Sequence, residues 1–144
     1  MKIPSGAQYE KITLGSQLSE GSFADIYEGV AQYGSDSDEV AVKVLKVKWL
    51  QNEELIDRFK DEAHLLMSLR HSNIMAVTQL VEFQNRPAVV MERIQGIDLK
   101  TVLTRRPSPA VSFAIAESIA VGLHAAYALP PPDMKEPLEV VHRD

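Results

Sequence analysis

The stretch from Tyr9 to Val30, YEKITLGSQLSEGSFADIYEGV, predicts two strands joined by a tip at Gly21. The residues that flank the tip are mainly β-branched, aromatic or apolar, as is typical of strands. The tip itself, SEGS at 19–22, is small and flexible and contains neither proline nor Asn-Gly. It is either an ordinary turn or a tip whose backbone N–H groups must approach a negatively charged group.

Further strands and helices are predicted outward from this hairpin. Residues 31–39 are expected to form a polar turn, and residues 40–47, VAVKVLKV, a third strand rich in valine. Asn52 is a suitable N-cap for a helix that carries Glu53 and Glu54 in its first turn. The apolar residues of this helix form one stripe, which consists of Leu55, Phe59, Leu66 and Leu69.

Two more strands are expected near residues 74–83 and 87–91, with the turn QNR between them. Gly96 marks a break in a short connector, and a long helix is predicted at 110–129. The proline-rich sequence PPPDMKEP ends that helix. Five strands, with one helix after the third and a helical segment at the end, give the order of an α+β protein.

The composition excludes several kinds of protein. The 144 residues carry a formal net charge of −5 with interspersed charges, so we expect neither nucleic acid nor an anionic membrane as a partner. The chain has no cysteine, which rules out disulfides and thiolate sites and fits a cytoplasmic location. We find no signal peptide at the N-terminus. The uncharged stretch at 118–132 is interrupted by three prolines, so we expect no membrane segment.

Lys43 lies in the strand sequence VAVK, where side chains alternate between the two faces of the sheet. Ala41 and Lys43 therefore share one face, and Val40, Val42 and Val44 share the other. A small alanine beside a lysine leaves room for a flat ligand next to a positive charge. The alternative is a buried strand whose lysine reaches solvent at the edge of the sheet.

Glu62 lies within the apolar stripe of the first helix, three residues after Phe59 and four before Leu66. A carboxylate that faces a core is unfavourable unless it has a cationic partner. Lys43, on the preceding strand, is the natural partner, and the alternative is an unpaired acid at the edge of the helix. We predict a buried Lys43–Glu62 pair, whose disruption would cost about 3–5 kcal/mol.

Taken in order, five motifs resemble the N-terminal lobe of a eukaryotic-type protein kinase, most of all the bacterial serine/threonine protein kinases. The glycine-rich loop G-x-G-x-x-G corresponds to SEGSFA (19–24), and V-A-I-K corresponds to VAVK (40–43). The helix-C glutamate corresponds to Glu62, which is followed by LRHSNI (69–74). VVMERIQG (89–96) resembles the fifth strand and hinge, and VVHRD (140–144) resembles the start of the catalytic loop.

This resemblance implies a fold and a division into domains. After an N-terminal extension at residues 1–8, residues 9–95 would form a kinase N-lobe, which is a five-stranded antiparallel sheet with helix C and the hinge. Residues 96–144 would then form the first helices of a truncated C-lobe that ends at the HRD motif. Two positions depart from the glycine-rich motif, since Ser19 and Ala24 replace glycines and stiffen the loop.

The resemblance also implies a function, the transfer of the γ-phosphoryl group of ATP to protein hydroxyl groups. Asp144 would be the catalytic base, and Lys43 and Glu62 would complete the catalytic residues. The residues that would contact ATP are Leu18, Ser19, Gly21, Ser22, Phe23, Ile26, Ala41, Lys43, Met91, Glu92 and Ile94. The arginine of HRD favours a protein substrate over a small molecule, and the overall likeness favours serine or threonine over tyrosine.

The family's ligands for Mg²⁺ would lie downstream of Asp144, so we expect no metal site within the chain and no activity from it alone. The alternative is a non-catalytic nucleotide-sensing or kinase-docking module. Reading the encoding DNA beyond Asp144 for an asparagine and Asp-Phe-Gly would distinguish the two.

The helix at 110–129 is apolar on every side, which is normal for a helix buried in a larger body. We therefore expect that it either packs against a second copy or a partner, or leaves an apolar surface exposed.

Overall fold

The computed structural model describes residues 8–128, 130–131, 135–137 and 140. The chain divides into two compact units, of which the first contains Met1–Met67 and Ala76–Arg93 and the second Ser68–Met75 and Ile94–Asp144. The predicted boundary after residue 95 remains a prediction, and the extension at 1–8 falls almost wholly outside the described residues.

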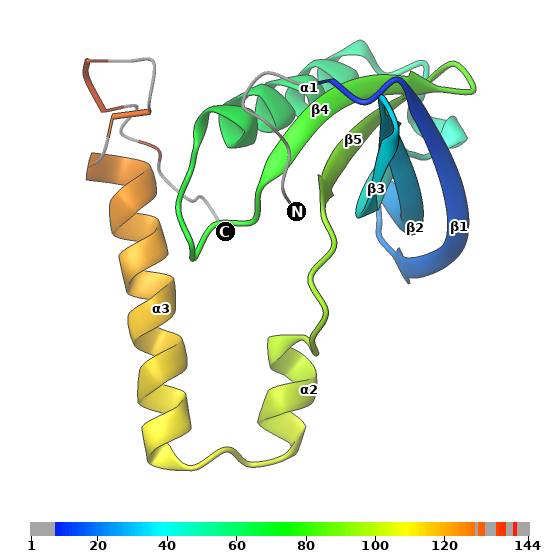
Figure 1. Cartoon of the computed structure of the whole chain (residues 1–144). Coiled ribbons are helices and arrows are strands. Elements are labelled where there is room, and N and C mark those ends of the chain that lie inside the picture. The colour runs from blue at the N-terminus through cyan, green and yellow to red at the C-terminus, as the bar shows by residue number, and fades with distance from the viewer. Residues whose placement is uncertain (1–7, 129, 132–134, 138–139, 141–144) are drawn as a thin grey trace. The chain divides into compact units, whose positions relative to one another are not determined.

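The first unit contains the predicted five-stranded antiparallel sheet (Figure 1). Its strand order is β1-β2-β3-β5-β4, so that β3 lies at the centre and the two hairpins form the sides. The strands are β1 (Lys11–Glu20), β2 (Ala24–Tyr33), β3 (Asp36–Leu45), β4 (Val77–Phe83) and β5 (Arg86–Glu92). This is the α+β arrangement that the sequence predicts.

The β2–β3 hairpin is longer than the sequence predicts, and the polar turn expected at 31–39 is wrong in its extent. The ladder continues to the pair Tyr33–Asp36, so that only Gly34 and Ser35 form the turn. Gly34 has a φ of +55°, a conformation that glycine adopts without strain. The polar side chains of this part of β3 are mostly exposed, so they carry no apolar signal for a strand.

The β4–β5 hairpin closes with the two-residue turn Gln84–Asn85, as expected from QNR except that Arg86 already belongs to β5. Both turn residues have positive φ, +50° and +60°. A type I′ turn needs positive φ at both central positions and matches the right-handed twist of the strands.

A cluster of buried residues in the first unit lies on one face of the sheet. Val40, Val42 and Val44 alternate along β3 and are at most 1% exposed. They form a cluster with Tyr9, Ala31, Ala88 and Val90 from the neighbouring segments. The predicted alternation of β3 is therefore confirmed, because its valines belong to this cluster and Ala41 and Lys43 occupy the opposite face.

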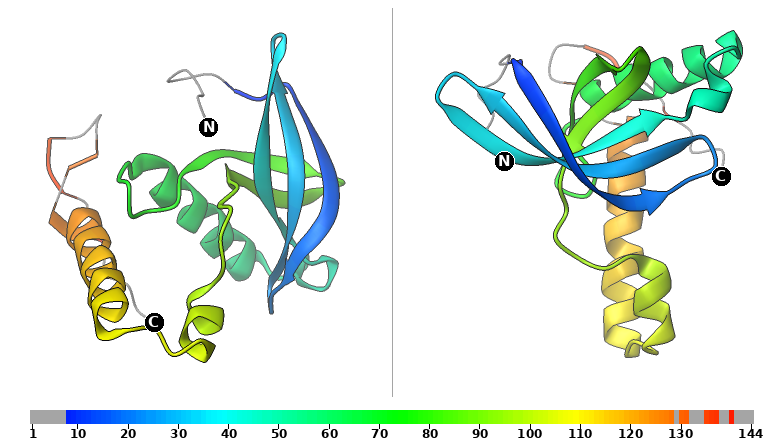
Figure 2. Two further views of the ribbon diagram at one scale, coloured as in Figure 1. Left: turned by 60° about the horizontal axis from the view of Figure 1, so that its bottom comes forward. Right: turned by 90° about the vertical axis from the view of Figure 1, so that its right-hand side faces the viewer.

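Helix α1 (Glu53–Ser68) follows β3 after a short 3₁₀ helix, η1 (Val47–Trp49), and lies alongside β4 (Figure 2). The predicted N-cap is confirmed, because the Leu55 N–H donates to Asn52 Oδ1 at 3.0 Å. Its fully buried residues are Phe59 and Ala63.

The second unit contains α2 (Leu99–Thr104) and α3 (Pro109–Ala128). The residue pattern gave no sign of α2 beyond the break at Gly96, although Asp98 caps it by accepting the Thr101 N–H at 2.6 Å. None of the six residues of α2 is buried, so its sequence lacks the regular spacing of apolar residues that predicts a helix.

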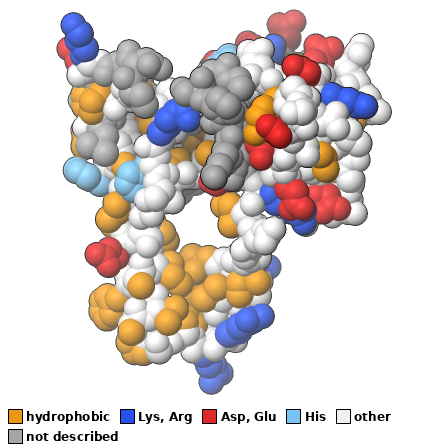
Figure 3. Space-filling view, viewed as in Figure 1, with side chains coloured by type: hydrophobic (Ala, Val, Ile, Leu, Met, Phe, Trp, Pro, Cys, Tyr) orange, Lys and Arg blue, Asp and Glu red, His pale blue; other side chains and the backbone are white. Residues whose placement is uncertain are grey.

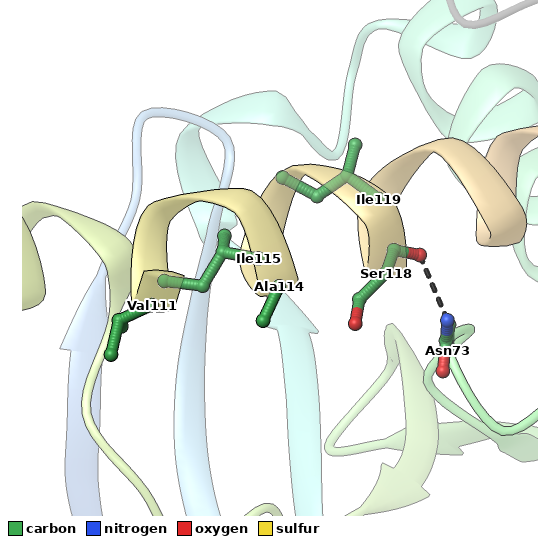
Figure 4. Close-up of a pocket in the computed structure, with 6 residues that line it drawn as sticks. All are labelled: Asn73, Val111, Ala114, Ile115, Ser118 and Ile119. Carbon is green, nitrogen blue, oxygen red and sulfur yellow. Dashed lines mark hydrogen bonds between the residues drawn. The ribbon is translucent and has the colours of Figure 1, made fainter. Parts of the chain in front are cut away.

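The loop at 68–75 packs against α3 through Asn73, whose Nδ2 donates to the Ser118 carbonyl at 2.9 Å. Gly122 permits this approach, since a Cβ there would lie 3.0 Å from the Asn73 carbonyl oxygen. A mainly apolar hollow of about 430 Å³ opens beside this contact and is lined by Asn73, Val111, Ala114, Ile115, Ser118 and Ile119 (Figure 4).

Helix α3 leaves much of its apolar surface exposed in the single chain, so whether a second copy or a partner covers this surface remains a prediction. Phe113 is 76% exposed, and Val111, Ile119, Val121, Leu123 and Tyr127 are each more than 40% exposed. Figure 3 shows the hydrophobic side chains that gather on α2 and α3. By length and composition α3 is also the one helix of the described residues that could cross a membrane. The core helix of a soluble protein meets the same criterion, so this finding does not conflict with the expectation of no membrane segment.

Candidate functional site

Four residues from the predicted site share the face of the sheet opposite the valine cluster. Ile26 on β2 is the cross-strand partner of Lys43, and Ala41 is the partner of Met91 on β5. Partners in an antiparallel ladder point to the same face, and Ala41 and Lys43 are two residues apart on β3. Strands β2, β3 and β5 therefore place an isoleucine, an alanine and a methionine beside one lysine.

The predicted ion pair between Lys43 and Glu62 is present. The distance from Lys43 Nζ to Glu62 Oε1 is 2.9 Å, and it joins β3 to α1. The same ammonium lies 5.5 Å from the centre of the Phe59 ring, so a cation–π contact also holds it. A carboxylate and an aromatic face on one helix thus fix the position of the lysine charge.

The predicted burial of this pair is wrong. The side chains of Lys43 and Glu62 are 30% and 54% exposed, whereas Ala63, the next residue of α1, is 1% exposed. One residue corresponds to about 100° around a helix, so the buried stripe passes through Ala63 and Glu62 lies at its edge. The pair is consequently accessible to a solvent-borne ligand, and its contribution to stability should be that of an exposed pair.

The tip between β1 and β2 is a closed turn in which Gly21 donates its N–H to the Ala24 carbonyl at 3.1 Å. The turn already uses this N–H, so the Gly21 N–H is not among the backbone donors of the tip that can face an anion. In the described part of the chain the N–H groups of Ser22 and Phe23 have no hydrogen-bond acceptor. A Cβ at Gly21 would lie 2.6 Å from the Ala24 carbonyl oxygen, so the turn requires glycine there.

The remaining predicted site residues are less closely grouped. Leu18 and Ser19 lie at the exposed end of β1, next to the tip. Glu92 ends β5, where its N–H donates to the Ala76 carbonyl at 2.9 Å and its carboxylate accepts the Ala76 N–H at 2.8 Å. Ile94 belongs to the second unit and is 67% exposed. Asp144, the predicted base, lies outside the described residues.

Residue-by-residue reasoning missed a cluster of charges on the same sheet face. Arg93 lies 3.1 Å from a carboxylate oxygen of Glu28 on β2 and 3.4 Å from one of Glu39 on β3. The pKa of Glu28 is lowered, first by the hydrogen bond from the Ser16 N–H and then by the Arg93 charge. The sequence signal was the two-residue spacing of Glu39 and Ala41 on β3, which places both on one face.

Cysteine is absent from the sequence, and the described residues contain no group of three or more histidine, aspartate or glutamate side chains that could hold a metal ion. The predicted site residues offer a positive charge at Lys43, backbone donors at a tight tip and an apolar face. Together they suit a ligand that has both a flat apolar part and an anionic part.

Comparison with known proteins identifies the family of this chain. A sequence model described as "Protein tyrosine and serine/threonine kinase" matches residues 12–144. The serine/threonine-protein kinase PkaB of Streptomyces coelicolor is 34% identical over 129 residues, covering 88% of this chain and 28% of that protein. The tyrosine-protein kinase MasK of Myxococcus xanthus is 30% identical over 151 residues, covering 99% of this chain and 23% of that protein.

Solved structures show the same fold. The PknI kinase domain of Mycobacterium tuberculosis is 22% identical, with a TM-score of 0.64, and the match covers 91% of this chain and 56% of that domain. The chain spans less than a third of the length of the curated relatives named above, 28% and 23%. The family match over residues 12–144 and these relatives establish that the chain belongs to the protein kinase family.

Proposed function

We propose that this chain forms the ATP-binding part of a serine/threonine protein kinase, which transfers the γ-phosphoryl group of ATP to protein hydroxyl groups. The serine/threonine assignment is supported by PkaB and by PrkC of Bacillus subtilis, which is 32% identical over 129 residues and is also named a serine/threonine-protein kinase. MasK carries the name of a tyrosine kinase, so an assay must compare both kinds of acceptor.

The observation that carries the proposal is the Lys43–Glu62 pair, with 2.9 Å between Nζ and Oε1. Phosphoryl transfer depends on positioning and on the stabilisation of phosphate charge. Lys43 would supply one positive charge to the phosphates, while Glu62 and Phe59 restrict where that ammonium can lie. Because the pair is partly exposed, a phosphate can reach the ammonium without unfolding α1.

The tip of the β1–β2 hairpin would bind the phosphates through the backbone N–H groups of Ser22 and Phe23. Its close turn fits this role, since the space a Cβ would occupy at Gly21 is filled by the Ala24 carbonyl oxygen. Backbone donors in a concave turn favour anions. The predicted contacts of Leu18 and Ser19 would lie at the edge of the same tip.

The adenine ring would lie against the apolar face formed by Ile26 and Ala41. Met91, the cross-strand partner of Ala41, would lie at the inner end of this face. The small side chain of Ala41 is 6% exposed and Met91 is 3% exposed, so both belong to a packed surface. Glu92 would offer a backbone group to the ring, and the contact of Ile94 remains a prediction from the sequence. In this assignment β2, β3 and β5 each contribute one apolar contact.

ATP supplies the phosphoryl group, and Asp144 would accept the proton of the substrate hydroxyl by virtue of its place in HRD. The described residues contain no fitting set of Mg²⁺ ligands, so none of them is assigned to the metal. We also propose a cytoplasmic location, to be checked by cell fractionation, because a protein kinase needs intracellular ATP.

The proposal is tested by titrating the 144-residue polypeptide with ATP and by assaying transfer from radiolabelled ATP. We expect weak, saturable binding that Lys43→Met reduces, and no transfer to casein or to a glutamate–tyrosine copolymer. Micromolar affinity would contradict the expectation of weak binding, and transfer would contradict the expectation that this polypeptide is inactive alone. If the reading frame continues beyond Asp144, we expect the longer polypeptide to transfer the γ-phosphoryl group to casein but not to the copolymer.

A further inference from the structure

The tip of the β1–β2 hairpin contacts the segment at 46–49. The function proposed above assigns no role to these contacts. The indole Nε1–H of Trp49 donates to the Ser22 carbonyl at 3.2 Å. The Trp49 ring also packs against Phe23, with 5.5 Å between the ring centroids. Trp49 is the only tryptophan of the chain, and all of these residues lie in the first unit.

Lys46 makes further contacts with the same tip. Its backbone N–H donates to the Phe23 carbonyl at 2.9 Å, and its ammonium lies 3.0 Å from Glu20 Oε1 and 3.2 Å from Asp25 Oδ1. The hydrogen bond to Glu20 and the nearby Asp25 carboxylate raise the pKa of Lys46. Two consecutive carbonyls of the tip, those of Ser22 and Phe23, are therefore both directed at the segment at 46–49.

The direction of these carbonyls also sets the direction of the neighbouring donors. A trans peptide is planar, and its C=O and N–H point to opposite sides. Since Trp49 holds the Ser22 carbonyl, the N–H of Phe23 in the same peptide unit points away from Trp49. Because the segment at 46–49 holds the Ser22 carbonyl, the Phe23 N–H lies on the side of the tip that faces away from this segment.

We propose that Trp49 is a positioning residue for nucleotide phosphates, because its indole N–H fixes the Ser22–Phe23 peptide with the Phe23 N–H directed outward. This inference rests on the proposed function and adds a residue that no motif contains. The loop has only one glycine of its motif, and a loop in which a hydrogen bond fixes the donor direction loses less conformational freedom when an anion binds.

The first test compares the binding of ATP and adenosine by the unaltered chain and by Trp49→Phe, which keeps an aromatic ring beside Phe23 and removes the N–H donor. Loss of one hydrogen bond should weaken ATP binding about 3- to 10-fold, with adenosine binding unchanged. Val47→Ala is the matched control, since Val47 lies in the same short helix η1 and is 66% exposed. An ATP-to-adenosine ratio that Trp49→Phe leaves unchanged would overturn the proposal.

The second test needs no nucleotide and uses the fluorescence of the single tryptophan. Acrylamide should quench Trp49 more strongly in Phe23→Ala than in the unaltered chain, while Phe113→Ala, which alters an exposed ring of α3, should have no effect. Equal quenching in all three would refute the contact between the tip and Trp49. If the unaltered chain binds neither ATP nor adenosine, both the proposed function and the role of Trp49 in phosphate binding are refuted. A quenching difference would then still show that Trp49 contacts the tip.

Discussion

The contribution of the Lys43–Glu62 pair to stability can be measured with a double-mutant cycle of Lys43→Met and Glu62→Gln. The two side chains are 30% and 54% exposed, so the coupling free energy should be that of a partly exposed pair, about 0.2–1 kcal/mol. A fully buried pair would instead lose about 3–5 kcal/mol when one partner is removed. The cation–π contact with Phe59 is lost whenever Lys43 is replaced, so the cycle cancels it.

The assay is urea unfolding of the four proteins at low salt and again at about 1 M NaCl, where the Debye length falls to about 3 Å. We expect the coupling to shrink at high salt. The pair Glu54–Arg58 on the same helix is a matched reference, with both side chains at least 75% exposed, and its coupling should be smaller. A Lys43–Glu62 coupling above about 3 kcal/mol would refute the exposed geometry, and a coupling of zero would refute the pair itself.

Three further predictions follow from the geometry of single residues. Gly21→Ala should weaken ATP binding in a titration, because its Cβ would lie 2.6 Å from the Ala24 carbonyl oxygen, and unchanged affinity would contradict this account of the tip. Val42→Ala should lower the free energy of unfolding by about 2 kcal/mol, as measured by urea unfolding, because Val42 is fully buried, and a change near zero would mean that the core repacks. The pKa of Asp98 is lowered from 3.8 by its hydrogen bonds with Thr101, so the stabilisation of α2 should be present above pH 3.8 and lost as the pH falls through the lower pKa of the folded state. Amide exchange in α2 would show this, and equal protection at neutral and acidic pH would count against it.

Much of the first unit could be predicted from residue patterns because its signals are local. The alternation of valines in β3 gave both the core face and the face of Lys43, and Asn52 with two following glutamates marked the start of α1. The five strands are all present in the predicted order along the chain. Each is bounded by a turn or a helix, and these boundaries can be recognised in the sequence.

The failures have physical causes that can be named. Strand β3 begins with polar residues whose partners are backbone groups of β2, so hydrophobic alternation could not reveal its first half. Glu62 was placed in the apolar stripe by its spacing to Phe59 and Leu66, but the helical turn brings Ala63 to the buried position instead. Both errors concern polar side chains at the margin of the core.

The contacts of the tip could not be predicted from local sequence at all. Trp49 and Ser22 are 27 residues apart, and nothing in either segment specifies the hydrogen bond between them. The same holds for Arg93, which is 54 residues from Glu39. Such contacts depend on how the strands are placed, and they are the part of the candidate site that only the fold provides.

The central claim is that the sheet face around Lys43 binds the phosphates and adenine of ATP, and calorimetric titration of the chain and of Lys43→Met with ATP tests it most directly. We predict saturable binding by the unaltered chain, weaker than micromolar, and at least about a tenfold loss of affinity in Lys43→Met. Far-UV circular dichroism must show that both proteins keep their secondary structure. Equal ATP affinity in the two folded proteins, or no binding by either, would contradict the account.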